Sequence, residues 1–420
     1  MRAAYTQTRP QGQESVWAVL ALLRHLPLES LACSVYDGEG LSLLAHSAPS
    51  LAPSLRSLTI CSVSGLRRSS GVAAAPLSSS DLDFLGALTG LKSLLLFWTV
   101  APASLSRLTA LTRLHLHVCN LSPALVADRL APLRGLRQLI FARWETPPTT
   151  LHALPACGSV TQLQCSLWHT GAATLAAAFP GVLEAKLSLL SEESAPVAPP
   201  PQPGAPRWSS VRSVAIRQYR HAPSCLQMLQ ALGALGGALR SLSITEYTHR
   251  TVDWRPELPE LLAILAAAPS LERLSLDTAV AMSAALSRPR LHACLKRLSL
   301  SSHHDYNGTS HGALTTAGLL DLGAAFPALE ELRLIDEWEE DRLGRQLDAL
   351  GAAGDTASAE RRREFPETDD GYLVRAIRRA QGRLAAAAAA AAAPAVSAHG
   401  GGDGMGGIAS IDLGAVSGGE

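Results

Sequence analysis

The segment from residue 111 to residue 121, LTRLHLHVCNL, decides the fold of this 420-residue chain. Its first six residues follow the form L-x-x-L-x-L, and successive copies of this phrase start 20 to 36 residues apart. This spacing suits one strand and one return segment per repeat. The twelve copies are LESLAC (28–33), LRSLTI (55–60), LKSLLL (91–96), LTRLHL (111–116), LRQLIF (136–141), VTQLQC (160–165), EAKLSL (184–189), VRSVAI (211–216), LRSLSI (239–244), LERLSL (271–276), LKRLSL (295–300) and LEELRL (329–334).

Each phrase is expected to be a β-strand. Alternate side chains of a strand face opposite ways, so the fourth and sixth positions point inward and the third, fifth and seventh point outward. The intervening segments indicate short helices: Ser80 or Asp81 would cap DLDFLGAL, Pro259 would open PELLAILAAA, and Thr316 would cap AGLLDLGAA. One coil cannot bury its own apolar face, so stability must come from stacked neighbours.

The segment 111–121 matches the longer pattern L-x-x-L-x-L-x-x-C-x-L, with Cys119 where the chain turns. The chain thus resembles leucine-rich-repeat proteins of the irregular, ribonuclease-inhibitor-like and F-box-associated kinds. The resemblance implies an α/β horseshoe solenoid, with a parallel β-sheet on the concave face and short helices on the convex face. It also implies a partner protein bound on the concave face. EAKLSL lacks its first apolar residue and is the weakest copy.

Three regions follow from this pattern. We expect an N-terminal cap helix region over residues 1–27, the solenoid of about twelve coils over 28–345, and a charged segment with an Ala/Gly-rich, low-complexity and largely disordered tail over 346–420. The proline-rich insertion 195–206 is expected to be a solvated surface loop, with a ligand for a proline-reading domain as the alternative.

Two further segments concern the end of the array. Residues 338–350 are expected to cap the last coil, because a solenoid needs a polar terminal layer. YLVRAIRRAQGRL (372–384) is expected to form a solvated helix that leads into disorder. The alternative is a basic amphipathic helix that touches a partner or a membrane surface.

Charge and cysteine content limit the classes of partner and compartment. Lys+Arg and Asp+Glu both number 36, so the net charge is zero and no general attraction to nucleic acid is expected. The seven cysteines are odd in number and form no C-x-x-C pair, which favours a reducing, cytoplasmic compartment. No stretch approaches the roughly 20 apolar residues of a membrane span. We expect a monomer.

No pattern of catalysis or cofactor binding is found, so we expect neither an enzyme nor a cofactor. G-x-S-x-G, Walker and H-E-x-x-H motifs are lacking. Two histidine groups are candidates for metal ligands, because imidazoles bind metals readily. His115 and His117 lack a third ligand, and the polar loop cluster lacks fixed geometry, so no metal is expected; that cluster is His303, His304, Asp305 and His311.

The predicted outward positions of coils three to five form an apolar and aromatic patch, which we call the aromatic island. Aromatic side chains beside arginines are typical of interface hot spots, and exposed apolar patches usually mark a partner site. The alternative is that Leu95, Phe97 and Trp98 lie buried beneath a loop or against irregular packing. The predicted protein-binding residues are Leu95, Phe97, Trp98, Arg113, His115, His117, Ile140 and Arg143.

Towards the C-terminus the same face is expected to become a polar strip that could orient a ligand. The fifth positions of coils nine to eleven are serines, and the seventh positions of coils ten and eleven are also polar. The residues of this strip are Ser243, Ser275, Ser299, Ser301 and Asp277.

The leading functional prediction is a non-enzymatic protein-interaction scaffold. Residues 16–35, VWAVLALLRHLPLESLACSV, resemble the latter half of an F-box, which implies as an alternative a substrate-recognition subunit of a cullin ubiquitin ligase, bound to the cullin adaptor. Family resemblance suggests a third role as a structural component of the ciliary axoneme. The corresponding locations are the cytoplasm or, as alternatives, the axoneme or the nucleus.

Overall fold

The computed structural model describes residues 27–35, 38–62, 79–97, 101–145, 156–168, 171–190, 208–218, 225–246, 258–276, 292–300, 316–334 and 372–392. All twelve phrases contribute a strand to one parallel sheet, in which every strand lies beside its sequence neighbours. The strands are β1 (Ser30–Val35), β2 (Ser57–Ser62), β3 (Ser93–Phe97), β4 (Arg113–Leu121), β5 (Gln138–Trp144), β6 (Gln162–Leu167), β7 (Glu184–Leu189), β8 (Ser213–Gln218), β9 (Ser241–Glu246), β10 (Arg273–Leu276), β11 (Arg297–Leu300) and β12 (Glu331–Leu334).

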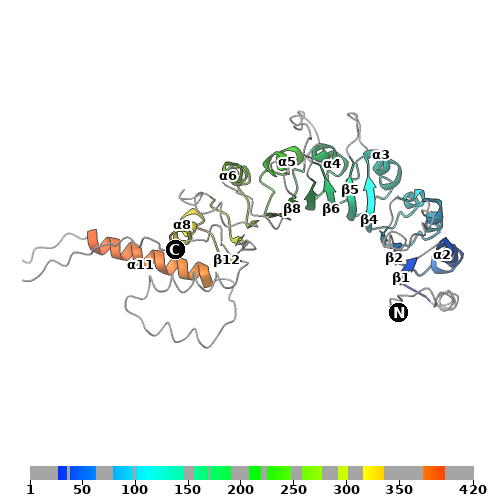
Figure 1. Ribbon diagram of the computed structural model, residues 1–420, viewed down its shortest axis with the longest axis horizontal. Coiled ribbons are helices and arrows are strands. Elements are labelled where there is room, and N and C mark those ends of the chain that lie inside the picture. Colours follow the sequence, from blue (N-terminus) through cyan, green and yellow to red (C-terminus); the bar gives the residue numbers. More distant parts are fainter. Residues whose placement is uncertain are drawn as a thin grey trace, which may run out of the picture.

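The sheet curves into an arc with its strands on the inner side and the helices on the outer side (Figure 1). The return helices are α2 (Gly38–Leu51), the 3-10 segments η2 (Ser79–Ala87) and η3 (Ala103–Arg107), α3 (Pro123–Leu125), the π-helical η4 (Val126–Leu130), α4 (Ala172–Ala178), α5 (Cys225–Leu232), α6 (Leu258–Ala267) and α8 (Thr316–Ala325). The predicted horseshoe, concave sheet and convex helices are confirmed.

The return segments differ in length because the coils differ in length. Only 20 residues separate the starts of the third and fourth phrases, and the helix between them, η3, is a five-residue 3-10 turn. Two other long coils hold α6 and α8, which have ten residues each. The 3-10 form of η3 crosses the outer side with few residues, since it rises about 2 Å per residue rather than 1.5 Å. The longest coil, with 36 residues between phrase starts, holds the nine-residue η2.

The inner ladder follows the predicted register. Fourth-position and sixth-position side chains are buried in almost every coil, for example Leu94 and Leu96 in β3 and Leu114 and Leu116 in β4. The first apolar residue of each phrase is buried as well; these residues are Leu28, Leu55, Leu91, Leu111, Leu136, Val160, Val182, Val211, Leu239, Leu271, Leu295 and Leu329. Each such side chain contributes about 1.5 to 3 kcal/mol, and its contacts come from its own and adjacent coils.

The seventh coil corrects the sequence alignment. In β7, Ala185 pairs with Leu163 and Leu187 pairs with Cys165, so the phrase of this coil is VLEAKL and starts at Val182, not at residue 184. Val182 is fully buried and supplies the first apolar residue that EAKLSL lacked. Because the shift is two residues, the division into inward and outward side chains is unchanged.

Cys119 does not end its strand as the family pattern implied. β4 continues through Cys119 to Leu121, and its pairing with β5 shifts between Leu116 and Asn120. The Cys119 side chain is buried, and burial raises the pKa of its thiol to about 11. The pattern therefore marks an irregularity of the ladder here rather than its end.

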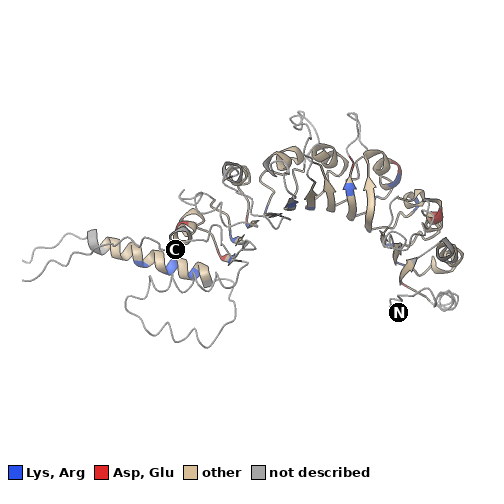
Figure 2. Ribbon diagram, in the orientation of Figure 1, with Lys and Arg blue, Asp and Glu red and all other residues tan. Residues whose placement is uncertain are grey.

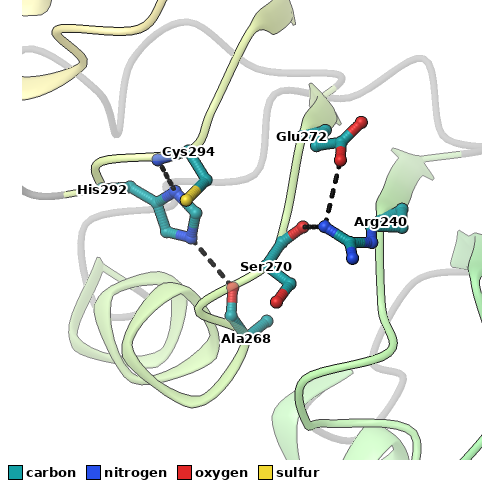
Figure 3. A network of polar contacts seen from close by, with 6 residues as sticks. All are labelled: Arg240, Ala268, Ser270, Glu272, His292 and Cys294. Atoms are coloured by element: carbon teal, nitrogen blue, oxygen red, sulfur yellow. Dashed lines mark hydrogen bonds and ion pairs between the residues drawn. The ribbon is translucent and has the colours of Figure 1, made fainter.

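Polar contacts fasten neighbouring coils together outside the sheet (Figure 3). The buried His292 ring donates from Nε2 to the Ala268 carbonyl at 2.9 Å, and its Nδ1 accepts from the Cys294 amide at 3.3 Å. Arg240 pairs with Glu272 on the next coil, with 3.0 Å between Nη1 and Oε1. The His292 bonds satisfy polar groups that stacking buries, whereas the Arg240–Glu272 pair lies exposed at the surface.

The last coil is covered by α11 (Tyr372–Ala392), so the expectation of a solvated helix over 372–384 is wrong. Leu373, Val374 and Ile377 are buried, and α11 packs on α8 and β12 (Figure 1). Arg378 Nη2 donates to the Leu329 carbonyl and Gln381 Nε2 to the Leu320 carbonyl, both at 2.7 Å.

The approach of α11 to α8 is close at Gly323. A Cβ at this position would lie 2.8 Å from Ile377 Cγ2, closer than van der Waals contact allows. Glycine here thus lets the two helices meet.

Several sequence predictions fall outside the described residues. These are the cap region 1–27 except residue 27, the proline-rich insertion 195–206, and the segment 338–350.

Candidate protein-binding surface

The aromatic island lies on the concave face of β3, β4 and β5. Leu95, His115 and Ile140 occupy equivalent positions on these strands and are paired in register. Trp98 lies outside the described residues. The repeat phrase therefore places the fifth-position residues of three coils side by side, as the sequence predicted.

A stacked ring pair is the most exposed aromatic feature of this surface. The rings of Phe97 and His117 are 4.4 Å apart between centroids and inclined by 6°. Phe97 is 37% exposed, and His117 is exposed as well. Leu95 beside them is half-buried. Because Phe97 is exposed, the alternative of a buried position does not hold for Phe97. An exposed stack of this kind offers a flat apolar platform to a partner.

His115 lies behind the ring pair and is half-buried. Its ring meets His117 edge-on, with 6.1 Å between centroids. Burial, and then the charges of His117 and Arg113, lower the pKa of His115, while a hydrogen bond with the Gln138 side chain opposes them. The imidazole is therefore mainly neutral at pH 7.

A bulge in β5 turns Arg143 towards the concave face. Ile140 pairs with Gln164, but Arg143 pairs with Ser166, so β5 has one extra residue between these pairs. Strict alternation would point Arg143 inward; the extra residue reverses it and leaves Trp144 buried instead. The Arg143 guanidinium carbon then lies 4.4 Å from the ring centroid of Trp168, a cation–π geometry.

Three buried polar atoms of this surface make no hydrogen bond: His115 Nε2, Arg143 Nε and Trp168 Nε1. Most buried polar groups in folded proteins have a partner, so each exception indicates a place for a water molecule or a ligand atom. All three belong to coils four to six. Among the described residues, the buried side-chain atoms without a hydrogen-bond partner therefore lie at and beside the aromatic island.

Trp168 was missed by the sequence reasoning. It occupies the ninth position of its coil, where Trp144 stands in the coil before. The two tryptophans differ in environment: Trp144 is buried and donates to Thr174 Oγ1 at 3.0 Å, whereas Trp168 is half-buried beneath Arg143. Two tryptophans in equivalent positions of adjacent coils were the available signal, but the β5 bulge is not encoded in the leucine phrase.

Two hollows lie among the described residues of the concave face. The smaller, about 160 Å³, adjoins Ile140 and is lined mainly by polar side chains of β5 to β7, among them Gln138, Gln164 and Lys186. The larger, about 320 Å³, lies over β9 to β12 and includes the predicted serines Ser243, Ser275 and Ser299. Asp277 and Ser301 of the predicted polar strip lie outside the described residues.

The described residues hold no group of three or more His, Cys, Asp and Glu side chains arranged to bind a metal ion. The loop histidines and Asp305 lie outside this part of the chain. Among the helices that the structure describes, none has the continuous apolar stretch of a bilayer-spanning segment. Figure 2 shows basic residues on strands of the sheet and along α11.

Searches for relatives found no matching family model and no matching curated protein. Two solved structures are similar to this chain. The crystal structure of a TLR13–ssRNA13 complex has 15% identity and a TM-score of 0.36, and the match covers 75% of this chain and 52% of that one. This chain thus matches about half the length of that structure.

The crystal structure of the internalin InlF from Listeria monocytogenes has 13% identity and a TM-score of 0.34, with coverage of 81% of this chain and 97% of that one. The fold itself rests on the geometry described above. Twelve leucine phrases in register on a sequentially ordered parallel sheet make this chain a leucine-rich-repeat solenoid.

Proposed function

We propose that this protein is a non-enzymatic scaffold that binds a partner protein on its concave sheet, with the aromatic island as the main contact. The observation that carries the proposal is the exposed stack of Phe97 and His117 beside the exposed Arg113. Burying an exposed ring in an interface removes a large apolar area from water, which favours association.

The surroundings of the stack support the same proposal. Gln138, Gln162 and Gln164 lie on the next two strands and supply polar groups suited to an interface rim. The unsatisfied atoms of His115, Arg143 and Trp168 provide further places for polar contacts, made directly or through water. An apolar centre with a polar surround is the usual anatomy of a protein interface.

The test is a pull-down from native lysate with the tagged full chain and quantitative mass spectrometry. Phe97→Ala with Trp98→Ala should lower recovery of the main partner at least about tenfold, as expected when a hot spot worth 2 kcal/mol or more is lost. Leu384→Ala is the matched control, because Leu384 is an exposed apolar side chain on α11. Equal recovery by both variants, with unchanged thermal melts, would refute the proposal.

The alternative role, a substrate-recognition subunit of a cullin ubiquitin ligase, depends on the F-box-like residues 16–35. Residues 28–33 of this segment belong to the first coil, and β1 takes part in the sheet beside β2. Residues 16–26 lie outside the described part.

Two experiments test the alternative roles. Co-purification of the chain with the cullin adaptor would support a ubiquitin-ligase role. Localisation of a tagged copy to the cilium would support a role in the axoneme.

A further inference from the structure

The concave surface of β9 to β12 carries hydroxyl and guanidinium groups and one carboxylate at its third and fifth positions, which we call the serine–arginine strip. Its third positions are Ser241, Arg273, Arg297 and Glu331, and its fifth positions are Ser243, Ser275, Ser299 and Arg333. All eight line the hollow of about 320 Å³. The strip has three arginines and one glutamate, whereas the whole chain has no net charge.

The strip already binds one carboxylate, supplied by the chain itself. Glu331 Oε2 lies 3.1 Å from Arg297 Nε, and Glu331 Oε1 pairs with Arg333. Each oxygen of the carboxylate therefore contacts a different arginine. Guanidinium groups bind carboxylates and phosphates with well-defined hydrogen-bond geometry, and this corner of the strip shows that its backbone spacing suits such binding.

Arg273 occupies the equivalent position one coil earlier, and among the described residues it has no such counter-charge. Its neighbours across the sheet are Ser241 and Arg297, so one neighbour is neutral and the other has the same charge. Like charges on directly opposite residues of adjacent strands destabilise a sheet. Arg273 is exposed and forms no ion pair within the described ranges. An external anion would relieve this repulsion and would form an ion pair with Arg273, as Glu331 does with Arg297.

We propose that the serine–arginine strip is a second binding site, which takes an anionic side chain, a carboxylate or a phosphate, from a peptide segment. Arg273 would provide the main charge-assisted hydrogen bonds, and the hydroxyls of Ser243 and Ser275 on the flanking fifth positions would complete them. The strip lies at least three coils from the aromatic island, so this proposal does not depend on that surface.

A peptide fits the strip better than a single-stranded nucleic acid does. Bases bind protein by stacking on aromatic side chains, and none of the residues that line this hollow is aromatic. Nucleic-acid affinity also depends on several basic contacts in a row, and here Glu331 lies at one end of the charged row.

The test is fluorescence anisotropy with the full chain, three labelled peptides and a labelled uridine oligonucleotide. Each peptide has Gly-Ser flanks and a central run of three identical residues, which are phosphoserine, glutamate or serine. We expect binding of the phosphoserine peptide, the glutamate peptide or both, weakening as salt rises, and no binding of the serine peptide. The stronger of the two anionic peptides identifies the source of the anion.

Arg273→Gln should raise the Kd of the bound peptide at least about tenfold, because a charge-assisted hydrogen bond is lost. Arg134→Gln is the matched control, since it removes an exposed arginine in the turn before β5 and should leave the Kd unchanged. Both variants should melt like the wild type. Failure of the wild type to bind either anionic peptide, an unchanged Kd in Arg273→Gln, or preference for a uridine oligonucleotide over both peptides would overturn the proposal.

Discussion

Leu114 illustrates what a single inner-ladder residue contributes. It is fully buried in β4 and pairs with Leu94 and Leu139 on the flanking strands. Leu114→Ala should lower the free energy of unfolding by about 2 to 5 kcal/mol, from lost burial and the cavity left behind. Urea unfolding monitored by circular dichroism measures this change in the free energy of unfolding. Arg113→Ala, the exposed neighbour on the same strand, should change stability much less, and equal effects would contradict the register.

His115 predicts how stability depends on pH. Burial lowers the pKa of His115 in the folded chain below 6.5, the value of an unperturbed histidine in the unfolded chain. Between the folded-state pKa and pH 6.5, the unfolded chain therefore binds a proton that the folded chain does not. Its stabilising contribution is present above pH 6.5 and is lost as pH falls through the folded-state pKa. His115→Gln should therefore lose less stability than the wild type between pH 7 and pH 5, and parallel unfolding curves would exclude this role.

At the scale of elements, α11 is expected to hold the last coil together. Ile377 is buried against α8 and the final coil, whereas Leu384, two turns further on, is 52% exposed. Ile377→Asp would bury a carboxylate without a counter-ion and should detach the helix. Hydrogen–deuterium exchange should then rise in β12 and α8.

Leu384→Asp is the matched control for that change, because it introduces the same side chain at an exposed site of the same helix. It should leave exchange in β12 unchanged. Protection of β12 that survives Ile377→Asp would show that the last coil does not depend on α11.

The strands and helices also show how much of the fold can be predicted from the sequence. Eleven phrases were placed in the correct register because buried leucines recur with the period of a strand. The seventh was misplaced by two residues, since Val182 is followed by Leu183 and Ala185 rather than by the usual leucine spacing. The packed face of α11 does have a signal in the sequence, because Leu373, Ile377 and Ala380 are spaced as one helical face.

The candidate surface was predictable only in part, for a physical reason. Fifth-position residues such as Leu95 and Ile140 follow directly from strand alternation, and the structure places them on adjacent strands. The contact between Arg143 and Trp168 depends on a bulge, and a bulge arises from how two neighbouring coils fit rather than from the phrase itself. The exposed Arg273 could likewise be located by register. That its described neighbours on the flanking strands are Ser241 and Arg297, neither of them acidic, is known only from the pairing of the coils.

For the whole molecule, the stacking of coils predicts that damage remains local. Each strand pairs only with the strands before and after it, so stability is close to a sum of coil and neighbour contributions. Leu298→Ala in β11 should raise hydrogen exchange in β10 to β12 and leave β3 to β5 unaffected. Leu114→Ala should give the reverse pattern. A uniform rise along the chain in either variant would indicate a single cooperative unit instead.

The sequential strand order also has a consequence for synthesis of the chain. Every strand after β1 finds its partner among residues that left the ribosome just before it, since successive phrases start no more than 36 residues apart. The sheet can therefore grow strand by strand from β1 while translation continues, and no early strand waits for a distant one. In this array the newest strand is always the unpaired edge, and α11, which is made after all twelve strands, packs against the last of them.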